Sequence, residues 1–260
     1  MRPDPAELRA ILEIYARPPG RSAYAVIATP EWTWTGGVAE DVCRPAASLL
    51  KVAVGIALEE HLTTLDAPRV GDLLRSDDVS VLHALGPERY LQPSELHALM
   101  LSASDAPSTR WAVDQVGIRA TQDVLAALGA HDSLVTADGE YGVLGVTTAR
   151  DAVRIVRAAD DPVRLPACAR ALRHSIMNAR IPLGVTSQDI TIAHKTGTLT
   201  GVAHDVAHLG CIRGDLWVAF LSEGQQDTLV TGYDMGLCTR ALLESSGLQA
   251  SRSRSFATRS

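Results

Sequence analysis

The sequence has few aromatic residues, no excess of positive charge and no long uninterrupted apolar run. Aromatic residues make up 4% of the 260 positions although hydrophobic residues reach 46%, so the core must be built mainly from Ala, Val and Leu. The formal net charge of -6 argues against a nucleic-acid partner, which requires a basic face. No stretch reaches the roughly 18 apolar residues of a membrane span. These absences favour a soluble enzyme or binding protein of one large domain or two packed lobes.

Paired cysteines are also missing. The four cysteines are far apart and include no C-x-x-C pair, so they give neither a zinc signature nor a disulfide framework. We expect free thiols at Cys43, Cys168, Cys211 and Cys238. The sequence predicts no metal and no cofactor.

The first twenty residues lack the uninterrupted apolar segment of a secretory signal. Charged residues interrupt the apolar positions, which recur at the spacing of one helix face, at Leu8, Ile11, Leu12 and Tyr15. This pattern predicts an amphipathic first helix and a cytoplasmic protein.

Strand patterns occur at both ends of the chain and helical patterns fill the middle. "SAYAVIATPEWTWTGG" predicts a hairpin, and the alternation returns from Ile190 in three further strands, followed by a helix over about 229–246. One antiparallel sheet would unite these strands. We therefore predict a sheet lobe formed by residues 1–46 and 188–250, a helical lobe over 47–187 inserted into it, and a disordered tail at 251–260. The cleft between the lobes is the expected ligand site.

Ser48 and Lys51 begin a strongly helical stretch that runs from about Ala47 to Leu62. Residues three apart are neighbours on a helix. A serine hydroxyl is a weak nucleophile that needs an adjacent base, and a buried lysine with a lowered pKa can serve. The alternative is a serine that caps the helix, followed by an ordinary lysine.

Two further short motifs carry chemical groups. Ser104-Asp105 interrupts an apolar helix just before Pro107, which is typical of a turn but also offers a second hydroxyl for proton transfer. Lys195, Thr196, Gly197 and Thr198 lie together on a predicted strand. A lysine and hydroxyls beside a glycine could bind a carboxylate and an acyl group, or Lys195 could simply protect an edge strand.

Taken together, the three motifs have the order and contexts of Ser-x-x-Lys, Ser-Asp-Asn and Lys-Thr-Gly in class A β-lactamases and penicillin-binding proteins. The chain resembles this family over nearly its full length, including "PAASLLKV", "ELHALMLSASD", "NARIP" and "AHKTGTLTGVAHDVAHLG". The resemblance implies an α+β fold with a five-stranded antiparallel sheet flanked by helices and an all-helical lobe.

The resemblance also implies roles for individual residues. Ser48 would be the nucleophile that forms an acyl-enzyme, Lys51 its base and Ser104 a proton relay. Lys195 and Thr196 would bind a substrate carboxylate, and the Ser48 and Thr198 N–H groups would form the oxyanion hole.

Two features depart from the family pattern. Ala106 replaces the asparagine of Ser-Asp-Asn, so the resemblance does not extend to binding of an acylamino side chain. The Glu-x-x-Leu-Asn loop is absent before Thr147 and Thr148, and Glu140, the only nearby glutamate, lies too close to Thr147 to match it. A positioned general base contributes about 10²–10⁴ in rate. We therefore predict poor hydrolysis of β-lactams.

Three histidines occur near the last strands, at His194, His204 and His208, without a known metal-ligand spacing. Strand alternation predicts that His194 and the adjacent Lys195 point to opposite sides. We predict His204 and Asp105 as substrate contacts. The sequence leaves open whether Arg213 assists Lys195.

These observations predict a cytoplasmic serine hydrolase or acyltransferase. Its partner would be a small-molecule acyl substrate, namely an ester, amide or lactam, with no nucleic acid and no membrane involved. A true β-lactamase or D-Ala-D-Ala peptidase with an unrecognised export route is the first alternative. A non-catalytic module that binds penicillin or acyl groups is the second.

Overall fold

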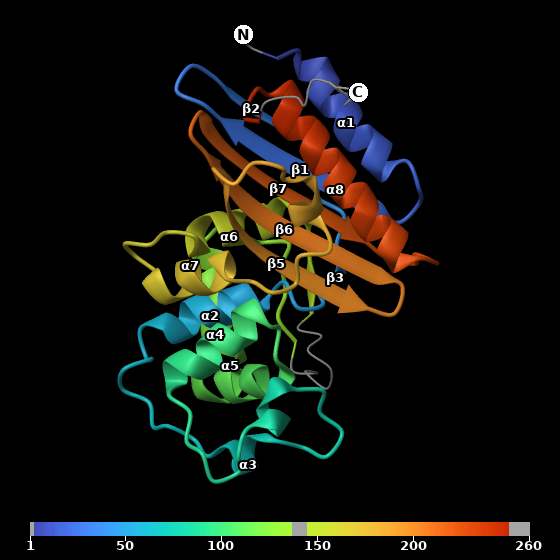
Figure 1. The fold of residues 1–260 in the computed structure, drawn as a ribbon. Coiled ribbons are helices and arrows are strands. Elements are labelled where there is room, and N and C mark those ends of the chain that lie inside the picture. Colours follow the sequence, from blue (N-terminus) through green and yellow to red (C-terminus); the bar gives the residue numbers. More distant parts are fainter. Residues whose placement is uncertain (1–2, 137–144, 250–260) are drawn as a thin grey trace, which may run out of the picture.

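The computed structural model describes residues 3–136 and 145–249, and a five-stranded antiparallel sheet crosses it (Figure 1). The strand order is β2-β1-β7-β6-β5. As predicted, the N-terminal hairpin joins three C-terminal strands: β1 pairs with β7 from Arg21 opposite Ser222 to Ala28 opposite Asp215. The strands are β1 (Arg21–Ala28), β2 (Thr33–Val38), β5 (Thr191–Leu199), β6 (Val202–Cys211) and β7 (Gly214–Ser222).

Helices α1 (Pro5–Ala16) and α8 (Thr228–Ser245) cover one face of the sheet (Figure 1). The amphipathic first helix is confirmed, because its apolar positions Leu8, Leu12 and Tyr15 are buried. They pack in a core with alternate residues of β1, which are Ala23, Ala25 and Ile27. No helix within residues 3–136 and 145–249 is long and apolar enough to cross a membrane.

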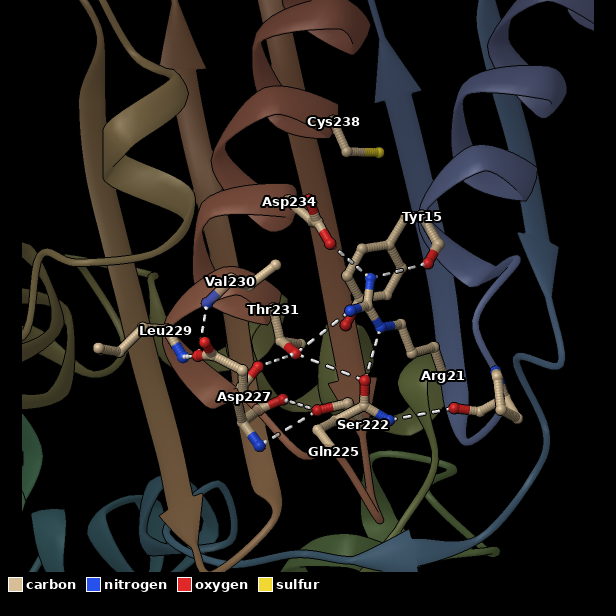
Figure 2. Close-up of polar contacts among 12 residues, drawn as sticks. Tyr15, Arg21, Ser222, Gln225, Asp227, Leu229, Val230, Thr231, Asp234 and Cys238 are labelled. Atoms are coloured by element: carbon tan, nitrogen blue, oxygen red, sulfur yellow. Dashed lines mark hydrogen bonds and ion pairs between the residues drawn. The ribbon is translucent and has the colours of Figure 1, made fainter.

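A buried arginine fixes the corner where α1, β1 and α8 meet (Figure 2). The Arg21 guanidinium forms an ion pair with Asp234 at 2.8 Å and donates to Gln225 Oε1 at 2.8 Å and Thr231 Oγ1 at 3.2 Å. The Gln225 backbone N–H donates in turn to the Gly201 carbonyl in the turn between β5 and β6. The network therefore also anchors the hairpin that carries the Lys-Thr-Gly motif.

The other face of the sheet rests on helices that belong to the middle of the chain (Figure 1). Tyr24, Val26 and Trp217 share one core with residues of α2 and α6. The helices are α2 (Lys51–Glu59), α3 (Val70–Leu73), α4 (Pro93–Ser102), α5 (Ala106–Ala127, kinked at Gly117), α6 (Ala149–Ala159) and α7 (Pro166–Arg173). Short elements complete the described residues: β3 (Arg44–Pro45), β4 (Val146–Thr147) and the 3₁₀ turns η1 (Val81–Ala84) and η2 (Ile181–Gly184).

The α+β architecture is thus confirmed. Because α6 and α2 share a core with the sheet, the apolar interior is continuous between the sheet and the helical part of the molecule. The bounds proposed for the two lobes stay a prediction. The tail at 251–260 lies outside the described residues.

His208 on β6 links the sheet to the end of α6. Its Nδ1 lies 2.6 Å from Asp160 Oδ2, and its Nε2 lies 2.9 Å from Asp215 Oδ1. The ring stacks on Trp217 with 4.8 Å between centroids. Burial lowers the pKa of His208, but hydrogen bonds to the two carboxylates outweigh burial, and the net shift is upward.

We expect this contact to make stability fall with rising pH. The folded-state pKa of His208 lies above its unfolded value of about 6.5, so the contribution is complete below that value and is lost as pH rises through the folded pKa. Thermal unfolding between pH 6 and pH 8.5 measures the effect. His208→Gln should reduce the fall of Tm with pH, whereas His61→Gln, at an exposed turn, should not. An equal fall of Tm with pH in the wild type and both variants would contradict this role of His208.

Candidate active site

Ser48 lies in a tight turn that leads into α2. The predicted helix from Ala47 is wrong at its start, because Ala47 has a left-handed φ of 48° and regular helix begins only at Lys51. In the turn before Lys51, backbone hydrogen bonds join residues three positions apart. Leu49 N–H donates to Ala46 O at 3.0 Å, and Lys51 N–H donates to Ser48 O at 3.4 Å. Ser48 is half-buried and stands one turn before Lys51. It is therefore not an ordinary helix cap.

Ser104 connects α4 to α5 in a strained conformation. Its φ is 59°, a left-handed value that costs of order 1–3 kcal/mol in a residue other than glycine and is enriched at functional sites. Lys51 Nζ donates to the Ser104 carbonyl at 2.7 Å and to its hydroxyl at 3.3 Å. The side chain of Lys51 thus points from α2 to the α4–α5 junction.

Lys195 reaches the same hydroxyl from the sheet. Its Nζ donates to Ser104 Oγ at 3.0 Å and to the Thr196 carbonyl at 2.9 Å. Lys51 and Lys195 are the only lysines in the sequence, and each side chain is almost completely buried. Two motifs 144 positions apart, at 51 and 195, therefore meet at one oxygen atom.

This arrangement disfavours a full charge on both lysines. Burial lowers the pKa of Lys51 to about 8, partly offset by the carboxylate of Asp105. Burial lowers the pKa of Lys195 well below its usual range, and the charge of Lys51 lowers it further. When Ser104 Oγ accepts hydrogen bonds from the Nζ atoms of both lysines, its own proton is directed elsewhere. The cluster thus holds a lysine that becomes an unprotonated amine as pH rises through about 8, and a hydroxyl that can donate a proton.

Within the described residues, no hydrogen bond joins Lys51 Nζ to the Ser48 hydroxyl; the lysine bonds to Ser104 instead. Catalytic hydrogen bonds are often long without substrate and shorten on binding. The pairing of Ser48 with Lys51 stays a prediction.

Gly197 determines how closely the turn before Ser48 approaches β5. A Cβ atom at Gly197 would lie 3.1 Å from Ala47 Cβ, 3.2 Å from the Ala46 carbonyl and 3.2 Å from His204 Cδ2. The position that a side chain at Gly197 would take is thus occupied by the protein's own turn and by His204. The missing side chain lets that turn rest on the strand, so that Ala47, the residue before Ser48, packs against the Lys-Thr-Gly motif.

We expect Gly197→Ala to slow acylation by about 10–100-fold while the protein still folds. The added methyl group displaces the turn by a few tenths of an ångström, and displacements approaching 1 Å can cost about 10² in rate. The rate of covalent labelling by an activated ester measures the effect. Gly86→Ala is the matched control because a Cβ there meets nothing within 4 Å. Equal labelling rates in the two variants would contradict this role.

The structure corrects the prediction that Asp105 contacts substrate. The Asp105 side chain caps α5, accepting from the Ser108 N–H at 3.0 Å and the Ser108 hydroxyl at 2.6 Å. Ser80 donates to its other oxygen, and the residue is 5% exposed. Its carboxylate therefore holds the Ser104 turn in place.

His204 is a second correction. Its Nε2 lies 2.7 Å from the Pro45 carbonyl, and its Nδ1 accepts from the Ser222 N–H at 3.0 Å. The residue is fully buried, and burial lowers its pKa to about 4. With both ring nitrogens engaged, His204 supports the strand beneath Gly197 and has no atom for a substrate.

Sequence reasoning missed Arg180. Its guanidinium donates to the Gly197 carbonyl at 2.8 Å and to Thr198 Oγ1 at 2.6 Å, and it also bonds to the His204 carbonyl. Burial lowers the pKa of Arg180. Arg213, by contrast, lies at the opposite end of β6, where it donates to the Gly247 carbonyl at 3.3 Å. Arg180 is therefore the guanidinium beside the Lys-Thr-Gly strand.

A buried pair holds the segment that carries Arg180. His194 Nδ1 lies 3.1 Å from Asp205 Oδ1, and its Nε2 lies 3.1 Å from Asn178 Oδ1. Asp205 also accepts from the Ile181 N–H at 3.0 Å. His194 thus binds residues that Lys195 does not, as strand alternation predicts, and these contacts tie residues 178–181 to β5 and β6.

Glu140 lies outside the described residues. Ala46, two residues before Ser48, donates its N–H to the Gly145 carbonyl at 2.7 Å. Gly145 is thus hydrogen-bonded directly to the turn that carries Ser48.

The fold is that of the β-lactamase-like serine hydrolase superfamily. A family model described as "Beta-lactamase enzyme family" matches residues 6–231, and the chain belongs to this family. A comparison with curated protein sequences gives no significant match.

Solved structures of the same fold are numerous. A β-lactamase from Sphaerobacter thermophilus DSM 20745 is 27% identical, with a TM-score of 0.78 over 95% of this chain and 100% of that one. A class A β-lactamase from Bacteroides cellulosilyticus DSM 14838 is 17% identical, with a TM-score of 0.78 over 94% and 99%. PBP-A is 18% identical, with a TM-score of 0.77 over 93% and 96%. At 17% and 18% identity, the last two structures show only that the fold is shared.

Proposed function

We propose that this protein transfers acyl groups through an ester on Ser48, with a small ester, amide or lactam as substrate. The observation that carries the proposal is the Ser104 hydroxyl that Lys51 and Lys195 share, because Lys51 follows Ser48 by three residues. Neutral Lys51 takes the Ser48 hydroxyl proton as the oxygen attacks the carbonyl carbon. The Ser48 and Thr198 N–H groups receive the developing oxyanion. Ser104 then gives its proton to the leaving group and regains one from the Lys51 ammonium.

A carboxylate on the substrate fits the other end of the site. Lys195, Thr196 and the exposed Thr198 hydroxyl lie along β5, and Arg180 already bonds to that hydroxyl. A carboxylate beside Lys195 would stabilise the charged form of that lysine. Because two neighbouring charges are disfavoured, the proton would then leave Lys51, which becomes the neutral base that acylation needs.

Slow removal of the acyl group is part of the proposal. The sequence has no Glu-x-x-Leu-Asn motif before Thr147 to position a water molecule. Loss of such a base costs about 10²–10⁴ in rate. We therefore propose slow hydrolysis of β-lactams and an acceptor that is either water or an amine. A cytoplasmic location, and hence an intracellular substrate, stays a prediction from the sequence.

A true β-lactamase or peptidase is the second candidate. Membership of the β-lactamase family and the 27% identity to the Sphaerobacter enzyme favour it. The two candidates differ in how fast the acyl group leaves.

The experiment compares the full-length protein with Ser48→Ala and Ser102→Ala, the latter a serine of α4 two residues from Ser104. Each is mixed with a fluorescent penicillin and a panel of activated esters, and intact mass and product release are followed over time. We expect a persistent adduct in the wild type and in Ser102→Ala and none in Ser48→Ala. An adduct that survives in Ser48→Ala, or no adduct and no turnover with any probe, would rule out the acyl-serine mechanism. Rapid penicillin turnover would establish the second candidate.

A further inference from the structure

A second cluster of reactive side chains lies among the helices, away from Ser48. It consists of Glu59 at the end of α2, His97 in α4 and Cys168 in α7. Glu59 is eight residues beyond Lys51, about 12 Å along the helix axis. The Cys168 Sγ atom lies 3.5 Å from His97 Nε2, which lies 3.9 Å from Glu59 Oε2. The three ligand atoms all lie within 4.8 Å of one another.

These atom types and separations suit a tetrahedral metal ion. Zinc binds thiolate sulfur at about 2.3 Å and imidazole nitrogen or carboxylate oxygen at about 2.0–2.2 Å, so neighbouring ligand atoms lie roughly 3.3–3.6 Å apart. The sulfur and the nitrogen already have this separation. The carboxylate oxygen, 3.9 Å from the nitrogen and within 4.8 Å of the sulfur, must move closer to both.

The surrounding chain fixes the ligands in advance. Glu59 accepts from the N–H groups of Ala167 at 2.6 Å and Cys168 at 2.9 Å, which holds its carboxylate at the start of α7. The Gly55 carbonyl lies 3.2 Å from His97 Nε2, on the side of the ring that faces the cluster. His97 and Cys168 are fully buried, whereas Glu59 keeps 9% of its side chain exposed and gives an ion a way in.

We propose that Glu59, His97 and Cys168 bind a zinc-type divalent cation, with the Gly55 carbonyl nearest to the fourth position. On binding, the Cys168 thiol releases its proton to solvent and the sulfur binds as thiolate. His97 binds through Nε2 and carries its proton on Nδ1, which is buried and has no partner among the described residues. Oxidation states do not change. The ion joins α2, α4 and α7, so its role is to stabilise the helical part of the molecule.

Cobalt(II) is the probe that reports thiolate ligation directly. Reduced, chelator-treated full-length protein is titrated with Co²⁺, and absorption is recorded. We expect one equivalent to give the strong visible bands of a four-coordinate centre with a thiolate-to-cobalt charge-transfer band, and zinc to abolish both. Cys168→Ser should remove the charge-transfer band. Cys211→Ser, a half-buried thiol on β6, is the matched control and should retain it.

A second measurement, the change in Tm on addition of zinc, tests the site even if Cys168→Ser does not fold. Zinc at about 100 times its Kd should raise the Tm of the wild type by roughly 5–10 °C, and Glu59→Gln should weaken this response at least about tenfold in zinc concentration. Absence of the charge-transfer band in the wild type, or a band that persists in Cys168→Ser, would overturn the proposal. So would an equal zinc response in Glu59→Gln and wild type. Covalent labelling of Ser48 does not depend on this ion, so the two proposals can fail separately.

Discussion

Lys51→Met should lower the rate of Ser48 acylation by about 10²–10⁴ while leaving a folded protein. A general base contributes this much when it takes the proton of the attacking hydroxyl. Methionine keeps most of the length and apolar character of the buried lysine, so the loss is one of chemistry more than of packing. The rate of adduct formation with an activated ester, followed by rapid quenching and intact mass, is the measurement.

The pH dependence separates this role from a structural one. The pKa of Lys51 is lowered to about 8, so its neutral fraction grows as pH rises through that value. The acylation rate of the wild type should therefore rise through about pH 8 and level off above it. Lys51→Met should lose this rise. Leu58→Met, an equally buried position in α2, should keep both the rate and the profile. A wild-type profile that is flat from pH 6 to pH 10 would contradict the role of Lys51.

Lys195→Met should discriminate between substrates with and without a carboxylate. A hydrogen bond to a charged group is worth about 1.5–3 kcal/mol, so a carboxylate-bearing ester should lose roughly 10–150-fold in acylation efficiency. A neutral ester of the same leaving group should lose far less. The comparison requires acylation rates for both esters at several concentrations.

The pH profile is a second property of the same variant. Because the charge of Lys51 lowers the pKa of Lys195, Lys195 loses its proton first as pH rises, and the rise in acylation rate with the neutral ester should stay near pH 8 in Lys195→Met. Arg213→Met removes a cation at the far end of β6 and should change neither property. Equal losses for the two esters would contradict carboxylate binding at Lys195.

Periodicity in the sequence was sufficient to predict the sheet. The strands β5, β6 and β7 extend over nine or ten residues each, and the first helix keeps its apolar residues on one face. The start of α2 could not be predicted, because nothing in the letters of residues 44–51 indicates the left-handed φ of Ala47. The turn packs closely against Gly197, which is distant in the sequence, so a local pattern could not include this contact.

The chemical groups were easier to predict than their partners. Motif order placed Lys51, Ser104 and Lys195 in one site, but only the fold shows that both lysines share the Ser104 hydroxyl. Asp105 and His204 were misassigned because capping and complete burial depend on neighbours that the motif does not include.

The sequence did contain an indication of Arg180. It lies in "NARIP", which supported the family resemblance without a role of its own. Its position beside Thr198 arises from the buried contacts of residues 178–181 with β5 and β6. The sequence did not indicate the cluster of Glu59, His97 and Cys168. Their spacing matches no ligand motif, and three separate helices bring them together.

The two buried lysines meet at Ser104, and Lys51 becomes largely neutral as pH rises above about 8. Because Lys51 and Lys195 are the only lysines in the chain, selective ¹³C and ¹⁵N labelling of lysine gives one NMR signal for each side chain. Titration of the full-length protein should show a pKa of about 8 for Lys51 and a strongly lowered pKa for Lys195. Each signal is assigned by comparing the wild-type spectrum with that of a variant in which the other lysine is substituted. Two signals that titrate together near the ordinary value of about 10.4 would contradict the account.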